Sequence, residues 1–153
     1  MTQLQSKFVT GQKTVIAPCA AGDVVAQTFY IDLAQALALN DVIELAVLPE
    51  YSRIVDATLD VDKLDTNGAP AIVMDIGLMS GKVGVLDNAR TVGNELFAAD
   101  VTAKNGGFTR LSKNAALRIA ETDQARSIGV KVTTAPATGA PTGRVALTLF
   151  IVG

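Results

Sequence analysis

The stretch that decides the fold covers residues 53–79, RIVDATLDVDKLDTNGAPAIVMDIGLM. Its first part alternates apolar residues with aspartate or threonine, the period of a β-strand with one face toward a core and one toward water. Residues 65–68, DTNG, form a turn signal, because Asn and Gly tolerate positive φ. The second part alternates again, with Ile72, Met74, Ile76 and Leu78 on one face. The stretch therefore predicts a β-hairpin with an acidic outer face.

Other parts of the chain predict further strands. β-branched and alternating apolar residues mark 24–31, 42–48, 115–120, 126–134 and 144–152. Asn94 followed by Glu95 predicts a short helix over 94–99, inside a long Gly- and Asn-rich connection. Because strands do not alternate with long helices, we predict an all-β fold, an antiparallel β-sandwich of jelly-roll type with one short helix in a long connecting loop. The predicted core includes Leu59, Val61, Ile76, Val130 and Leu147.

The length of 153 residues suits one domain with its own core, and 49% of the residues are apolar. We expect an extended N-terminal arm over residues 1–14 and a single β-sandwich domain over residues 15–153. Leu4, Phe8 and Val9 are isolated apolar residues in this polar arm. The arm is therefore either a frayed terminus or a segment that packs on a neighbouring subunit.

The final strand is apolar on both faces near its end, so it is either central in its sheet or covered by another chain. Leu4, Phe8, Val9 and Phe150 are accordingly the candidate contacts with a partner chain. Such contacts predict a homo-oligomer.

The charge balance excludes several classes of partner. The 13 basic and 15 acidic residues give a net charge of −2, which is too balanced for a dedicated nucleic-acid binder. The chain has no run near the roughly 20 apolar residues of a membrane helix, and its polar beginning does not resemble a signal peptide. Cys19 is the one cysteine, so no intrachain disulfide can form, which fits a reducing cytoplasm.

The sequence gives little support for catalysis or for metal binding. The absence of histidine removes Ser-His-Asp and Cys-His catalysis and His-ligated zinc. An EF-hand calcium loop counted from Asp60 fails, because its fifth and sixth positions are Leu64 and Asp65. We therefore expect no cofactor and no metal.

Carboxylate pairs like those of glycosidases are formally possible. Such sites usually contain aromatic side chains that stack on sugars, however, and the chain has no Trp. The candidates for such a pair are Glu44, Asp56, Asp60 and Asp75. Residues 77–82, GLMSGK, end in Gly-Lys without the Walker spacing. We expect that the protein is not an enzyme.

Several stretches carry a resemblance to a known family. They are LNDVIEL at 39–45, LP at 48–49, RIVDATLDVD at 53–62, DIGL at 75–78, FAA at 97–99 and IGVKV at 128–132. Over residues 20–152 the chain resembles small virion proteins of tailed bacteriophages, which are often encoded beside the major capsid protein. The arm lies outside this part.

The resemblance implies a capsid decoration, or cement, protein: a β-sandwich on the outer surface of the capsid that bridges capsid subunits. The implied partners are the major capsid protein and copies of the chain itself, as a dimer or trimer, with no membrane or nucleic acid. The implied location is the virion, after synthesis in the host cytoplasm. The alternative is a β-sandwich binding module of a phage tail or surface protein that recognises carbohydrate or protein, for which a shallow groove with Asn, Asp and an aromatic residue would speak.

Overall fold

The computed structural model describes residues 1–19 and 22–153; residues 20 and 21, within the expected domain 15–153, lie outside the described part. Its elements are β1 (Gln3–Gln5), β2 (Val24–Leu33), β3 (Val42–Leu48), β4 (Arg53–Val61), β5 (Val73–Met79), β6 (Phe97–Asp100), the 3-10 helix η1 (Thr102–Lys104), β7 (Gly107–Arg110), α1 (Asn114–Leu117), β8 (Arg126–Thr134) and β9 (Gly143–Val152). In the described part, the helices are all too short to cross a membrane.

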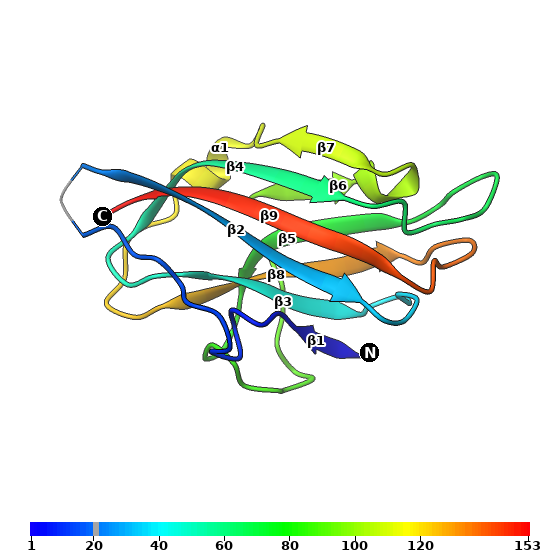
Figure 1. Ribbon diagram of the computed structural model, residues 1–153, viewed down its shortest axis with the longest axis horizontal. Helices are drawn as coiled ribbons and strands as arrows, with labels where there is room; N and C mark the ends of the chain where they lie inside the picture. The colour runs from blue at the N-terminus through cyan, green and yellow to red at the C-terminus, as the bar shows by residue number, and fades with distance from the viewer. Residues whose placement is uncertain (20–21) are drawn as a thin grey trace.

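The strands form two packed sheets. The five-stranded sheet has the order β1-β3-β8-β5-β6, and the four-stranded sheet has the order β2-β9-β4-β7, with β2, β9 and β4 in front in Figure 1. The eight strands from β2 to β9 divide between the sheets in the order of a jelly roll, and their pairs are antiparallel. The predicted all-β sandwich of jelly-roll type is confirmed.

The core between the sheets is mainly aliphatic. Leu59, Val61, Ile76, Val130 and Leu147 are at most 2% exposed, as predicted. β9 lies between β2 and β4, so its apolar residues are explained by a central position in the sheet. Its inward-facing Leu149 and Ile151 are buried, whereas Phe150 and Val152 remain half-exposed on the outer face.

The predicted hairpin over residues 53–79 is wrong, although both of its strands exist. β4 pairs with β9 and β7, while β5 pairs with β8 and β6 in the opposite sheet. Because each strand has one apolar face, the two can bury those faces against each other across the core. The connection crosses from one sheet to the other instead of turning back within a sheet.

Asp65 fixes this crossing. Its carboxylate is buried and accepts hydrogen bonds from five backbone N–H groups, at 2.7 to 3.4 Å, which belong to Asn67, Ala71, Ile72, Ala137 and Thr138. Burial raises the pKa of Asp65, but these N–H donors outweigh burial and hold the pKa well below its usual value. Residues 65–68, which carry the turn signal, thus connect the loop after β4 to the loop between β8 and β9 by hydrogen bonds.

Two local predictions are also wrong. The expected helix at 94–99 is absent, and residues 97–99 belong to strand β6: Phe97 pairs with Ile76, and Glu95 accepts a hydrogen bond from Leu78 N instead of starting a helix. The expected strand at 115–120 begins as helix α1, whose Ala116 is buried. Alanine favours helix over strand, so local propensity decides here.

Candidate functional site

The N-terminal segment lies on the sandwich. β1 pairs in parallel with β3, which places Leu4 opposite Ile43. Phe8 packs edge-on to Phe29, with ring centroids 4.9 Å apart, and Phe8 and Val9 are only 8% and 7% exposed. Phe8 and Val9 are therefore not isolated in an extended arm, as expected from the sequence, because Phe8 finds its apolar partners within its own chain.

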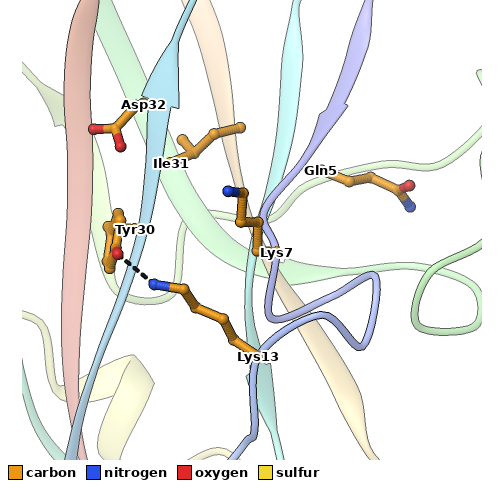
Figure 2. A pocket seen from close by; sticks show the side chains of 6 residues that line it. All are labelled: Gln5, Lys7, Lys13, Tyr30, Ile31 and Asp32. Atoms are coloured by element: carbon orange, nitrogen blue, oxygen red, sulfur yellow. Dashed lines mark hydrogen bonds between the residues drawn. The ribbon is translucent and has the colours of Figure 1, made fainter.

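Residues 6–13 form a tight loop that brings two lysines together. Ser6 Oγ donates a hydrogen bond to Leu45 O at 2.5 Å, and Lys13 N donates one to Lys7 O at 3.0 Å. Gly11, with φ of 75°, permits the reversal between them. The lysines line a hollow of about 350 Å³, hereafter the basic hollow (Figure 2). Its lining residues are Gln5, Lys7, Lys13, Tyr30, Ile31 and Asp32.

Tyr30 lines the basic hollow and contacts two cations. Lys13 Nζ donates a hydrogen bond to the Tyr30 hydroxyl (Figure 2), and the Arg144 guanidinium lies 4.6 Å from the ring centroid. The hydrogen bond from Lys13, and then its charge, lower the pKa of Tyr30. Asp32 Oδ1 lies 2.7 Å from Arg144 Nε, so this carboxylate is already paired. Lys7 and Lys13 then give the basic hollow a net positive charge.

A second hollow, of about 640 Å³, adjoins the first and is acidic. Asp60 of β4 and Asp62 line it, and Asp62 accepts a hydrogen bond from Arg144 N at 2.8 Å. Asp32 lines both hollows, so opposite charges lie side by side on one face of the molecule. We call the second one the acidic hollow.

On the outer face of the four-stranded sheet, one row across β2, β9 and β4 consists of uncharged threonines. Thr28, Thr148 and Thr58 stand opposite one another on β2, β9 and β4, and the first two hydroxyls are 2.7 Å apart. Phe150, half-exposed, lies in the next row on this face between Ala26 and Asp56. Of the four predicted contact residues, Phe150 alone has its place on this face.

Residues 80–96 cover part of the outer face of the five-stranded sheet, around Gly77 and Gly129. A Cβ on Gly77 of β5 would lie 2.1 Å from Glu95 Oε2 and 2.5 Å from Gly93 C. A Cβ on Gly129 of β8 would lie 2.9 Å from Val92 Cγ2. The two glycines therefore let this loop, hereafter the covering loop, pack directly on the sheet backbone.

A buried ion pair fastens the covering loop. Arg90 Nη1 lies 2.9 Å from Glu44 Oε2, and Arg90 Nη2 donates to Ser127 Oγ at 3.1 Å, while Ser127 Oγ in turn donates to Glu44. Burial raises the pKa of Glu44, but hydrogen bonds from Ser127, Gln5, Gly84 N and Arg90 outweigh it and lower the pKa. We missed this cluster in the sequence, although a glutamate inside the apolar strand VIELAVL was the signal for it.

The four carboxylates that were formally available for a glycosidase-like pair do not converge. Glu44 is engaged with Arg90, Asp75 accepts a hydrogen bond from Ala99 N at 2.7 Å, and Asp56 accepts one from Arg110 Nε at 2.8 Å. Asp60 lies on the opposite sheet from Glu44 and Asp75. Within residues 1–19 and 22–153, His, Cys, Asp and Glu form no cluster that could hold a metal ion.

Comparisons with known proteins place this jelly roll among viral proteins. A chain of the Ralstonia phage GP4 capsid structure is 50% identical and superimposes with a TM-score of 0.96, over 99% of this chain and 97% of that one. A chain of the Cyanophage Pam1 capsid asymmetric unit is 20% identical, with a TM-score of 0.69 over 93% of this chain and 94% of that one, which shows the fold alone. No protein-family model and no curated protein matches the sequence.

The fold and the comparisons define a class, the jelly-roll proteins found in phage capsids. This chain belongs to the family of phage capsid proteins represented by the Ralstonia phage GP4 chain.

Proposed function

We propose that this chain is a decoration, or cement, protein that binds the outside of a phage head and stabilises it by bridging capsid subunits. The observation that carries this proposal is the identity of 50% over nearly the whole chain with a protein of a phage capsid. The implied partners are the major capsid protein and further copies of this chain, and its place is the outer surface of the virion. Catalysis, a cofactor, a membrane and nucleic acid have no part in this role.

A rigid surface suits such a role, because binding by a preorganised surface costs little ordering entropy. The side chains of Val85 and Leu86 in the covering loop are 47% and 67% exposed. Hydrogen bonds fix the backbone of the loop on both sides of Leu86. Val85 O accepts hydrogen bonds from Arg90 Nη1 and Gln3 Nε2, and Asp87 N donates one to Gln3 Oε1. We propose that this apolar tip contacts the head.

The N-terminal segment has a more restricted role than the sequence suggested. We keep the division into an arm of residues 1–14 and a sandwich domain of residues 15–153 as a proposal. A contact of Leu4, Phe8 or Val9 with the capsid or a neighbouring subunit would require the arm to leave the sandwich, because Phe8 and Val9 are buried there. Phe150, half-exposed, can act as a contact without any rearrangement.

The test is to mix purified protein with undecorated heads, isolate the heads by sedimentation, and heat decorated and bare heads in parallel. Co-sedimentation and a higher temperature of head disruption support the proposal, and failure to co-sediment overturns it. Leu86→Asp should weaken co-sedimentation, whereas Leu117→Asp, at another exposed leucine, serves as the matched control.

A further inference from the structure

A third hollow, of about 450 Å³, lies between the start of the covering loop and the start of β8. Residues 81–83 form one wall and residues 122–126 form the other. Its lining includes two cations, Lys82 and Arg126, and one carboxylate, Asp123. We call it the Arg126 hollow, and its charge is positive on balance.

Arg126 has no counter-charge within the part of the chain that the structure describes. Its Nη2 donates a hydrogen bond to Ala120 O at 2.8 Å, whereas its buried Nε has no acceptor among the described residues. Neither Arg126 nor Lys82 belongs to an ion pair of residues 1–19 and 22–153. Burial lowers the pKa of Arg126. A partly buried cation without a counter-ion is unfavourable, so an anion that enters the hollow is attracted more strongly than at an exposed arginine.

Both walls of the Arg126 hollow are held by Arg90, which is itself buried. Arg90 Nε donates a hydrogen bond to Ser80 O, just before Gly81 in the chain. Arg90 Nη2 donates one to Ser127 Oγ at 3.1 Å, just after Arg126. The hollow is therefore formed in the isolated chain, and an incoming group binds there at little cost in ordering entropy.

The Arg126 hollow adjoins the apolar tip at Val85 and Leu86. Val85 N donates a hydrogen bond to Lys82 O at 3.4 Å, so hollow and tip belong to one turn of the covering loop. Lys82 is exposed, and a protein surface that covers the tip also comes close to it. A guanidinium and an ammonium group both bind carboxylates through charge-assisted hydrogen bonds.

We infer that the Arg126 hollow receives an aspartate or glutamate side chain of the major capsid protein when the apolar tip lies on the head. This inference rests on the proposed function and adds the chemistry of the partner surface, which is a carboxylate beside an apolar patch. Lys82 meets the carboxylate at the mouth of the hollow, and the guanidinium of Arg126 supplies the second positive charge.

The first experiment removes both cations with Lys82→Gln and Arg126→Gln. Co-sedimentation of a concentration series with undecorated heads gives the dissociation constant, which should rise on the order of tenfold. Lys63→Gln with Lys104→Gln, the same charge change elsewhere, should leave the constant unchanged. Circular dichroism shows whether each variant is folded. If the double variant does not fold, Lys82→Gln alone should still raise the constant about threefold.

The outcomes separate the two proposals. A wild-type chain that binds heads together with a folded variant that binds equally well would overturn this inference and leave the proposed function standing. A wild-type chain that does not bind heads would overturn both.

The second experiment identifies the partner group. Carbodiimide joins a carboxylate to an amine that it touches, and we expect it to link Lys82 to an aspartate or glutamate of the major capsid protein on decorated heads. Mass spectrometry of the digested heads locates the link. Lys82→Arg keeps the charge without the amine, so it should bind heads normally and lose the link. Decorated heads without this link, or with Lys82 linked only to another copy of the chain, would contradict the inference.

Discussion

Arg90 and Glu44 form an ion pair of 2.9 Å in which both side chains are almost completely buried. They join the covering loop to β3, and Ser127 of β8 bridges the two. A buried ion pair is costly to form, so it is retained where it fixes one arrangement among several. Here it fixes where the covering loop lies on the five-stranded sheet.

Breaking this pair should strongly destabilise the fold. Arg90→Leu leaves the Glu44 carboxylate buried without its cation, and we expect a loss of about 3–5 kcal/mol in the free energy of unfolding. Urea denaturation measures it. The double variant Glu44→Leu with Arg90→Leu should lose less than the two single losses combined, since no unpaired charge remains. Additive losses would contradict the role assigned to the pair.

The glycine of β5 should be intolerant of a side chain. Gly77→Ala places a Cβ against the backbone of Gly93 and Asn94, and we expect a loss of about 1–3 kcal/mol from overpacking. Limited proteolysis should then cut within residues 80–96. Gly68→Ala is the matched control, because a Cβ there has no heavy atom within 4 Å. Equal resistance of both variants would show that the covering loop does not pack on this strand.

Acid should destabilise the connection between β4 and β5, because Asp65 holds it in place. Its folded-state pKa lies below the unfolded value of about 3.9, so its contribution to stability is complete above that pH and is lost as the pH falls toward the folded-state pKa. Melting temperatures measured from about pH 7 downward should therefore fall less steeply with acid in Asp65→Asn, which starts from a lower value at neutral pH. Asp123→Asn, at an exposed carboxylate, is the control. Parallel pH curves for Asp65→Asn and wild type would contradict this assignment.

Phe8 tests whether the N-terminal segment is part of the fold. Because Phe8 is buried against Phe29 and Tyr30, we expect Phe8→Ala to lower the free energy of unfolding by about 3 kcal/mol. Thermal unfolding followed by circular dichroism measures the change. An unchanged melting temperature would instead show an arm that contributes nothing to the isolated domain.

The sequence predicted the layers of the fold better than the partners of its strands. Alternation showed which face of residues 57–61 and 73–79 is buried, since that depends only on the period of two. It placed Val55 on the buried face wrongly, because a bulge between Ile54 and Asp56 buries Ile54 and exposes Val55. It could not show that the two strands face each other across the core, because pairing depends on β8 and β9 far along the chain. The buried position of Phe8 was missed for the same reason, as Phe29 lies beyond the reach of any local pattern.

The candidate functional site was only partly visible in the sequence. Phe150 stood out because it lies within the apolar run of residues 149–152, and the acidic face around Asp60 followed from alternation. The basic hollow did not, because Lys7 and Lys13 meet only when residues 6–13 fold back on β2. The Glu44–Arg90 pair likewise joins residues that no spacing rule connects.

The position of β9 has a consequence for how the chain folds. β9 lies between β2 and β4, yet it follows every other strand in the chain. Until it emerges from the ribosome, β2 and β4 each lack their main hydrogen-bonding neighbour. The four-stranded sheet can therefore be completed only after β9 has been made, and a nascent chain that ends before β9 would expose unpaired edges of β2 and β4, which favour aggregation.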